Sequence, residues 1–183
     1  MSTLDNILDE INRAESIVIL THENPDGDAI GTGLALYNAL KQIGKNPDII
    51  IPEYPRIFGF LPGTDEIKKE SNIEKYDLAI SVDCATIKML NGFANYFENA
   101  KVKVSIDHHS TNTMFGDINY VSPDSPACAQ ALLVILEYFK IDITKEIGTC
   151  ILTGIITDTG GFKYSGVTAE TFEFVASLLT KGI

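Results

Sequence analysis

The stretch SIVILTHENPDGDAIGTG, residues 16–33, joins a short apolar run to a polar segment rich in glycine. Its first part, 16–21, has the β-branched apolar side chains of a buried strand. Further on, apolar residues recur with helical spacing from Ile30 to Ile43, and Gly44 suits a left-handed helix end. A histidine and two aspartates stand between the two elements, where a plain turn would suffice. The stretch therefore predicts a strand, a polar loop suited to chemistry, and a helix.

The same alternation of apolar runs and amphipathic helices extends along the chain. Further strands are predicted at 48–52, 77–82, 101–106 and 118–121. Further helices are predicted at 3–14, 86–99, 124–139, 144–157 and 168–181. The segment 56–67 carries turn residues and reads as an irregular connection. Apolar strands that alternate with helices indicate a parallel sheet with helices on both faces, so we predict one Rossmann-like α/β domain over residues 1–183.

Charge and cysteine content narrow the partners and the compartment. The formal net charge is −11 and the only arginines are Arg13 and Arg56, so a basic face that grips a polyphosphate backbone is not expected. The cysteines, Cys84, Cys128 and Cys150, are odd in number and lie in apolar segments. They predict reduced core thiols and a cytoplasmic protein. No apolar stretch reaches the roughly 18 residues of a membrane span, so no membrane partner is expected.

Ionisable side chains follow several of the apolar runs. In an open parallel sheet, ligands bind outside the carboxyl ends of the strands, near the point where the strand order reverses. The residues that follow predicted strands, or the apolar stretch CILTGII at 150–156, are His22, Asp26, Asp28, Asp83, Asp107, His108, His109 and Asp158. They include every histidine of the chain. We expect these side chains to converge on one crevice.

Carboxylates gathered in one crevice repel one another strongly in a low dielectric. Because arginine is so scarce, divalent cations are the simplest neutralising groups. Imidazole and carboxylate ligands without thiolate favour Mn²⁺, Mg²⁺ or Fe²⁺ over a structural zinc site, although Zn²⁺ or Co²⁺ could occupy such a site. The number of acidic ligands indicates two cations, which together bind a bridging hydroxide and hold a phosphoryl oxygen for in-line displacement.

Four ordered motifs carry a resemblance to a known family. They are HENPDGDAIGT at 22–32, VDCA at 82–85, DHH at 107–109 and TDTGGFKY at 157–164. The set resembles the motifs of the DHH phosphoesterase superfamily. Its closest likeness, which extends over nearly the whole chain, is to the bacterial oligoribonuclease and 3′-phosphoadenosine 5′-phosphate phosphatase group. The resemblance implies a two-metal phosphoesterase, with Mn²⁺ as the expected cation. It implies short single-stranded oligoribonucleotides as substrates, and 3′-phosphoadenosine 5′-phosphate as a second one.

The resemblance also implies the metal ligands. The first cation would be held by His22, Asp26 and Asp83, and the second by Asp28, Asp83, His108 and Asp158. Asp83 would bridge the two cations and fix their separation. A homodimer of the full-length protein is left open by the resemblance.

The remaining implied roles concern the substrate side and the loop. His109 would contact the scissile phosphate or assist the leaving oxygen. Asp107 would not bind a cation itself but would orient an imidazole and fix its tautomer. Gly27, Gly31 and Gly33 are expected to let the first loop turn tightly, so that its aspartates face inward.

In one respect the chain departs from the family pattern. Family members carry a second domain with a glycine-rich GGGH-like motif that holds the substrate, and no such motif occurs in residues 1–183. The chain stops at LLTKGI, about where the linker to that domain is expected. We therefore expect a DHH catalytic domain, excised or truncated, without the C-terminal DHHA1-type domain.

Other functions fit parts of the pattern. A cyclic dinucleotide phosphodiesterase or a pyrophosphatase of the same superfamily would use the same motifs. The Asp-Gly-Asp spacing also suits an aspartyl-nucleophile phosphatase of the haloacid-dehalogenase type, but there the first aspartate stands at the strand end, whereas Asp26 lies several residues beyond it. A metal- or nucleotide-binding module without turnover is the remaining alternative, although the glycine spacing is not the dinucleotide fingerprint.

Overall fold

The computed structural model describes residues 2–51 and 53–183, and its centre is a six-stranded parallel sheet. The strands are β1 (Ile17–Leu20), β2 (Asp48–Ile50), β3 (Ile67–Lys68), β4 (Leu78–Val82), β5 (Val102–Asp107) and β6 (Ile118–Val121). They lie in the order β3-β2-β1-β4-β5-β6, and each neighbouring pair is parallel. The chain runs outward from β1 to β3 and then restarts at β4, so the strand order reverses between β1 and β4. This confirms the predicted Rossmann-like sheet.

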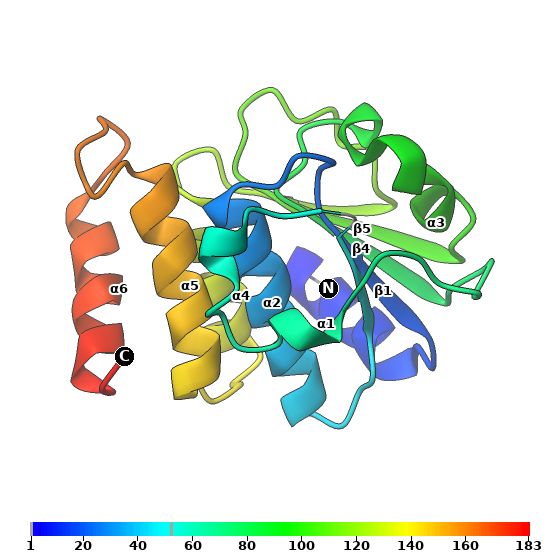
Figure 1. Cartoon of the computed structure of the whole chain (residues 1–183), viewed down its shortest axis with the longest axis horizontal. Helices are drawn as coiled ribbons and strands as arrows, with labels where there is room; N and C mark the ends of the chain where they lie inside the picture. The colour runs from blue at the N-terminus through cyan, green and yellow to red at the C-terminus, as the bar shows by residue number, and fades with distance from the viewer. Residues whose placement is uncertain (1, 52) are drawn as a thin grey trace.

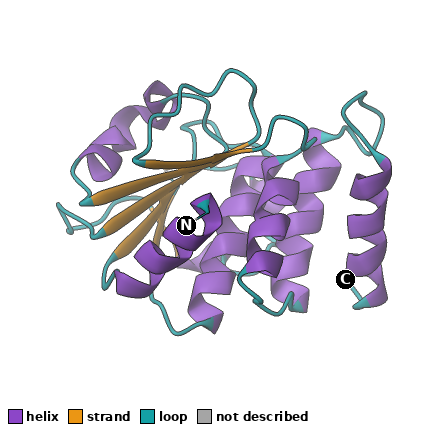
Figure 2. Cartoon of the chain, turned by 180° about the vertical axis from the view of Figure 1, so that it is seen from behind, coloured by secondary structure: helices purple, strands orange, loops and turns teal. Residues whose placement is uncertain are grey.

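Helices cover both faces of the sheet unequally. They are α1 (Thr3–Arg13), α2 (Gly27–Gln42), α3 (Ala94–Glu98), α4 (Cys128–Tyr138), α5 (Lys145–Asp158) and α6 (Ala169–Thr180). The larger core contains buried residues of α1, α2, α4 and α5, whereas a smaller core lies under α3. Figure 1 shows α6 outside α5 at one end of the molecule, and Figure 2 shows the sheet between the short helix and the larger helical layer.

Strand β1 shows why the sheet needs both layers. Ile17 and Ile19 belong to the larger core, while Val18 and Leu20 belong to the smaller one. Successive side chains of a strand point to opposite faces, so a run of four apolar residues is buried only when both faces are covered. The apolar run in the sequence thus predicts the layered arrangement correctly.

Three elements differ from the sequence-based prediction. The segment 86–99 is a 3₁₀ helix, η3 (Ile87–Phe93), followed by the short α3, with a break at Asn91, where φ is 41° and ψ is −118°. Helix α4 begins at Cys128 and not near 124–126, and its N-cap residue, Ala127, offers no side-chain acceptor. Strand β3 pairs with β2 at the sheet edge, at the end of the segment that the sequence predicts to be irregular.

Gly31 and Gly33 lie inside helix α2, which corrects their predicted role in the loop. A Cβ atom at residue 31 would lie 2.5 Å from the Cys150 carbonyl oxygen of α5, closer than real Cβ atoms approach. Glycine here lets the backbones of α2 and α5 pack directly against each other. The contact fixes the end of α5 relative to the loop after β1.

Candidate metal centre

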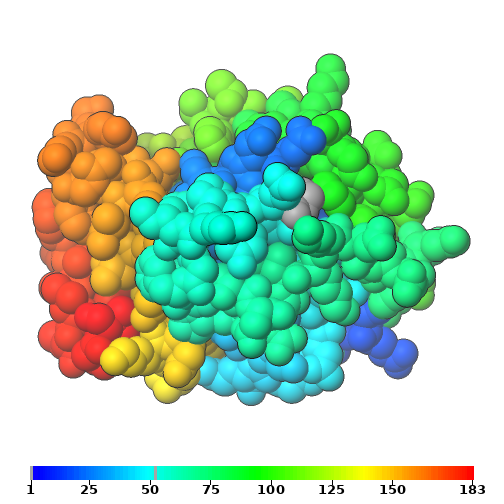
Figure 3. All heavy atoms as spheres, in the orientation of Figure 1, coloured from blue at the N-terminus to red at the C-terminus, as the bar shows by residue number. Residues whose placement is uncertain are grey.

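The polar side chains predicted from the sequence converge at the carboxyl ends of adjacent strands. The loop after β1, the residue after β4 and the end of β5 supply most of them, and these three strands are neighbours in the sheet. Helix α5 ends at Asp158 and brings that carboxylate to the same place. The centre thus lies where the strand order reverses, which is the usual ligand position in open α/β sheets. Figure 3 shows the loop after β1, in blue, at the molecular surface beside the cyan residues that follow β2.

Three overlapping groups of potential ligand atoms form within this centre, and one of them is Asp83, His108 and His109. The ligand atoms of His22, Asp26 and Asp83 all lie within 4.8 Å of one another. Those of Asp28, His108 and Asp158 satisfy the same limit. The six residues expected as metal ligands therefore fall into two adjacent groups.

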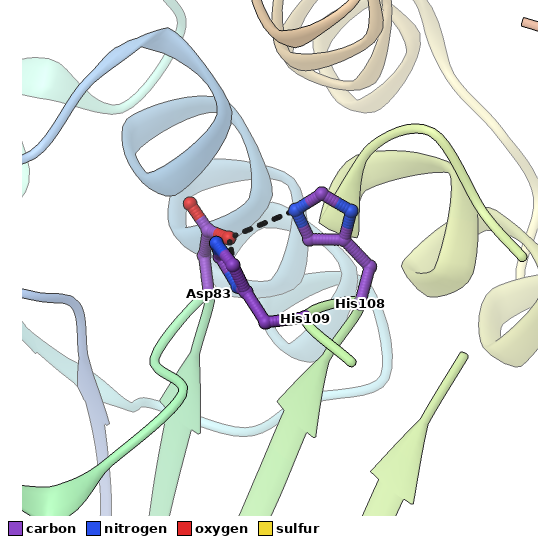
Figure 4. Close-up of side chains that lie close together, drawn as sticks. All are labelled: Asp83, His108 and His109. Atoms are coloured by element: carbon purple, nitrogen blue, oxygen red, sulfur yellow. Dashed lines mark ion pairs between the residues drawn. The ribbon is translucent and has the colours of Figure 1, made fainter. Parts of the chain in front are cut away.

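Asp83 stands between the two groups. Its Oδ2 lies 3.8 Å from His22 Nε2. Its Oδ1 lies 3.5 Å from His108 Nε2, and Figure 4 shows this carboxylate beside His108 and His109. Asp83 is 3% exposed, and Oδ1 has no hydrogen-bond partner among the described residues. Its φ of 56° is rare for residues other than glycine. Burial, followed by repulsion from Asp28 and Asp26, raises the pKa of Asp83 well above its usual range. A buried, unpartnered carboxylate oxygen is costly unless a cation binds it.

His108 directs its Nε2 toward the carboxylates. Its Nδ1 lies 3.1 Å from the Ser125 carbonyl oxygen, which can only accept, so Nδ1 carries the hydrogen. Nε2 lies 3.4 Å from Asp158 Oδ2 and 3.9 Å from Asp28 Oδ2, and it carries the free lone pair when the ring is neutral, as a metal ligand must be. Lone pairs that face one another across such distances favour a cation between them, and a backbone carbonyl that fixes the tautomer is typical of metal-binding histidine.

Asp28 is fully buried and caps a helix that lies far away in the sequence. Its Oδ2 and Oδ1 accept hydrogen bonds from the backbone N–H groups of Cys128, at 2.6 Å, and Ala129, at 2.9 Å. The Thr32 hydroxyl donates to Oδ1 at 3.1 Å. This explains why α4 begins at Cys128, since the carboxylate from α2 supplies the acceptor that Ala127 lacks. Burial raises the pKa of Asp28 to about 6 despite these donors.

Asp26 combines a structural role with a place in the centre. It is the N-cap of α2, and its Oδ1 accepts from the backbone N–H groups of Asp28 and Ala29. A capping oxygen needs only one side of the carboxylate, so Oδ2 is left for another partner. His22, which shares its group, is largely buried, and burial lowers its pKa, which favours the neutral ring that a metal requires.

Asp158 is held at an unfavourable position for a carboxylate. It is the last residue of α5, where the helix dipole disfavours negative charge. Burial raises the pKa of Asp158 as well. A nearby cation would offset both effects.

His109 and Asp107 form a hydrogen-bonded pair at the edge of the centre, and His109 Nδ1 also lies 3.7 Å from Asp83 Oδ1. His109 Nδ1 lies 2.7 Å from Asp107 Oδ1, and this hydrogen bond raises the pKa of His109. Asp107 is fully buried, whereas the His109 ring is 39% exposed. Because Nδ1 is engaged with Asp107, Nε2 is the nitrogen of His109 that is free for a further contact.

Lysine and arginine do not neutralise the centre. Within residues 2–51 and 53–183, the ion pairs of Asp28, Asp83, Asp107 and Asp158 involve only histidines. The ion pairs made by lysine and arginine lie at other positions. Oxygen and imidazole donors, an orphan Asp83 oxygen and no ammonium or guanidinium partner together fit divalent cations.

Several supporting residues are not apparent from the sequence. Thr32 holds Asp28, the Ser125 carbonyl holds His108, and Asn112 donates to Asp107 at 2.7 Å. Thr32 lies one helical turn after Asp28, and this spacing could have predicted the contact from the sequence. The Ser125 contact has no such signal, because it depends on how the loop before α4 folds.

The comparisons with known proteins assign the family. Residues 16–155 match the model of the N-terminal domain of the DHH family, and this chain belongs to that family. The resemblance noted in the sequence is thereby confirmed. Among the described residues, no helix is long and apolar enough to span a membrane.

Individual relatives extend over nearly all of this chain. It is 36% identical, over 91% of its length, to the bifunctional oligoribonuclease and PAP phosphatase NrnA of Thermus thermophilus, of which it covers 50%. An exopolyphosphatase-related protein from Bacteroides fragilis superposes with a TM-score of 0.91 at 30% identity, over 99% of this chain and 57% of that one. A putative family II inorganic pyrophosphatase from Methanococcus jannaschii has the same fold, with a TM-score of 0.68 at 20% identity over 91% and 56% of the two chains. The chain spans about half the length of these relatives.

Proposed function

We propose that this chain is the catalytic domain of a two-metal phosphoesterase that hydrolyses short oligoribonucleotides, with 3′-phosphoadenosine 5′-phosphate as a second substrate. Mn²⁺ is the proposed cation. The observation that carries the proposal is the position of Asp83, whose two carboxylate oxygens face histidines of different ligand groups. The name of the Thermus relative, at 36% identity, supports the substrate class.

The geometry supports a bridging role for Asp83. His22, Asp26 and Oδ2 of Asp83 would hold one cation, while the other oxygen joins the second ligand group, Asp28, His108 and Asp158. When bound, two such cations activate water and stabilise the charge of a transferring phosphoryl group. The chain itself keeps His108 in the tautomer with an open Nε2 and keeps Asp83 in a strained backbone conformation that aims its carboxylate at both groups.

His109 would act on the substrate side. Asp107 holds its Nδ1, and the partly exposed ring is free to present Nε2 to the substrate. From there it would bind the scissile phosphate or donate a proton to the leaving oxygen. The hydrogen bond from Asp107 raises the pKa of His109, which favours a ring that carries a proton to give.

A surface hollow beside the centre offers room for the rest of a nucleotide. It has a volume of about 390 Å³ and is lined by His22, Glu23, Asn24, Lys88, Met89 and Asn91. Lys88 and the two asparagines supply hydrogen-bond donors of the kind that phosphate and base edges accept. The hollow therefore supports a nucleotide substrate that extends beyond the phosphate being cleaved.

A metal titration combined with a hydrolysis assay tests the proposal. The metal-free chain is titrated with Mn²⁺ by calorimetry, and a diribonucleotide, 3′-phosphoadenosine 5′-phosphate, cyclic di-AMP and pyrophosphate are then compared under single-turnover conditions. We expect two Mn²⁺ per chain and Mn²⁺-dependent cleavage of the first two compounds. Preferred cleavage of cyclic di-AMP or pyrophosphate would reassign the substrate, and metal binding without any cleavage would contradict the catalytic function.

A pair of matched variants links the activity to the centre. Asp158→Asn removes an expected ligand, whereas Asp142→Asn changes an aspartate whose side chain is 78% exposed and which precedes α5, the helix that Asp158 ends. Asp158→Asn should bind fewer Mn²⁺ and lose turnover, and Asp142→Asn should match the wild type. Equal activity in the two variants would show that the chemistry does not use this centre.

A further inference from the structure

Asn112 has contacts that its place in an exposed loop does not predict. Its Nδ2 lies 2.7 Å from Asp107 Oδ2 and 3.0 Å from the Cys84 carbonyl oxygen, so the two hydrogens of one amide are directed to two different segments. Its Oδ1 accepts from the Met114 backbone N–H at 2.7 Å. A single side chain thus joins the end of β5, the turn after β4 and its own loop.

On one side, Asn112 completes the hydrogen bonding of a buried carboxylate. Asp107 is fully buried, and its two oxygens are divided between His109 Nδ1 and the amide of Asn112. Without the amide, Oδ2 of Asp107 would lose its side-chain partner in a place that water does not reach, which is costly for a carboxylate. The carboxylate would then be free to rotate away from His109.

On the other side, Asn112 holds the turn that contains Asp83. Cys84 directly follows Asp83, whose φ of 56° is a strained backbone conformation that persists only when the surroundings impose it. Several hydrogen bonds hold this turn, including one from the Thr113 hydroxyl to the Ala85 carbonyl at 3.3 Å, and three others involve backbone carbonyls in the same way. They are Asp83 N–H to the Ile106 carbonyl, the Asn112 amide to the Cys84 carbonyl, and Thr113 N–H to the Ala85 carbonyl.

We propose that Asn112 is a positioning residue that sets His109 relative to the Asp83 carboxylate. Its backbone N–H donates to the His109 carbonyl oxygen at 3.1 Å, whereas its side chain acts through Asp107 on one side and through the Cys84 carbonyl on the other. The proposal rests on the proposed function, because it deepens the assignment of His109 and Asp83 as parts of one reaction centre. It predicts a defect in turnover larger than any defect in folding or in substrate binding.

The isosteric variant Asn112→Asp separates this role from a local structural one. Aspartate keeps the shape and the acceptor for Met114 N–H, but it has no hydrogens to give to Asp107 or Cys84. Because the added carboxylate would also repel that of Asp107, the effect of Asn112→Asp is compared with that of Asn112→Ala, which removes the amide without adding charge. Asn112→Ala removes the whole group and serves as the second variant if the extra carboxylate prevents folding.

Asn119 provides a matched control. It lies in β6, nearby in sequence, and makes two side-chain hydrogen bonds, but both go to the backbone of Gly116 in the preceding turn. Asn119→Ala therefore removes two side-chain hydrogen bonds without touching Asp107 or Cys84. Its melting temperature gives the cost of losing an asparagine with a purely structural role.

Kinetics with Mn²⁺ and a diribonucleotide supply the first readout. We expect kcat to fall about 10- to 100-fold in Asn112→Ala and Asn112→Asp, as is typical when a partner behind the reacting groups is removed. KM and Mn²⁺ stoichiometry should stay close to the wild type, and Asn119→Ala should keep its kcat. Wild-type kcat in Asn112→Asp, or an equal loss in Asn119→Ala, would overturn the proposal.

The ring nitrogens of His109 supply a second readout that needs no turnover. In long-range ¹H–¹⁵N spectra of the metal-free chain at fixed pH, wild-type His109 should show a protonated, hydrogen-bonded Nδ1. Both Asn112 variants should shift or broaden this signal, and Asn119→Ala should not. An unchanged His109 signal in both Asn112 variants would overturn the positioning role. Absence of wild-type turnover would instead overturn the proposed function and leave the spectra to decide on Asn112.

Discussion

The two ends of strand β4 carry aspartates in opposite situations. Asp77 precedes the strand, accepts hydrogen bonds from the backbone N–H groups of Glu15 and Ser16, and pairs with Lys101 Nζ at 2.7 Å. Asp83 follows the strand, lies among other carboxylates and has an unpartnered oxygen. Lys101 and the backbone donors lower the pKa of Asp77, whereas burial raises the pKa of Asp83.

This difference shows how one fold separates stability from function. At the amino end of the strand, the carboxylate is satisfied by the protein itself and stabilises the folded chain. At the carboxyl end, it is left unsatisfied, which costs stability unless a ligand supplies positive charge. Unsatisfied charge of this kind concentrates at functional sites, because it can be neutralised on binding.

The largest effect is expected from Asp83→Asn. Asparagine tolerates the left-handed backbone, so the fold should persist. Loss of the shared carboxylate should lower turnover by more than about 100-fold, beyond the usual cost of changing a supporting residue. The metal-free variant should also melt at a higher temperature, because the burial and carboxylate repulsion that raise the pKa of Asp83 no longer oppose folding, with a gain of about 1–2 kcal/mol. Calorimetry and kinetics measure both changes, and a less stable metal-free variant would refute the contrast with Asp77.

The pH dependence of stability should have opposite signs for Asp28, a carboxylate of the centre, and for Asp77. Burial raises the pKa of Asp28 to about 6, so the folded, metal-free chain binds more protons than the unfolded chain between about pH 4 and 6. Stability from this group is therefore lost as the pH rises through that window, by about 2–3 kcal/mol. The lowered pKa of Asp77 has the reverse consequence, since its contribution is lost as the pH falls below about 4.

Melting curves with and without Mn²⁺ test this contrast. Because the ligands must lose their protons to bind a metal, the Mn²⁺-induced rise in melting temperature should grow between pH 4.5 and 7, a window set by these pKa values. Asp28→Asn should flatten the metal-free slope in the same window. A Mn²⁺ effect that is independent of pH would contradict the assignment of Asp28.

A smaller effect is expected from Asp77→Ala. The change removes the acceptor of two backbone N–H groups and the partner of Lys101, and it should lower the free energy of unfolding by about 1–2 kcal/mol. Mn²⁺ binding and turnover should remain at wild-type levels, because the residue lies at the other end of the strand. Urea unfolding and the hydrolysis assay together check this outcome, and a loss of turnover without a loss of stability would reverse the comparison.

The sequence predicts the positions of the centre well because they follow from strand topology. Once β1, β4 and β5 are recognised as parallel neighbours, His22, Asp83 and His108 must meet at one edge. It does not predict the start of α4, because the cap comes from Asp28, 100 residues earlier in the chain. A helix start is inferred from local residues. Asp124 to Pro126 are residues typical of a helix start, but α4 begins only at Cys128.

Gly31 and the edge strand β3 show the same limit of prediction from local sequence. Gly31 reads as a loop residue until the contact between α2 and α5 is known, because the backbone of Cys150 lies in another helix. Strand β3 has two residues, too few for an alternating pattern, and exists through its pairing with β2. Asn112 reads as a loop residue because the partners that give it a role, Asp107 and the turn after Asp83, are assembled only by the fold.

The smallest effect is expected from removing one hydroxyl beside Asp28 and one beside Asp77. Thr32→Val deletes a donor to Asp28, and Ser16→Ala deletes the acceptor of the Asp77 backbone N–H. Each should cost about 0.5–1.5 kcal/mol or less, since one hydrogen bond is lost. Only Thr32→Val should alter the metal response. The ionised form of Asp28 loses a donor, so its pKa should rise and the pH midpoint of Mn²⁺ stabilisation should move upward. Equal pH midpoints in the two variants would show that Thr32 only packs against Asp28. The carboxylates of the centre would then be no more sensitive to a lost hydrogen bond than Asp77.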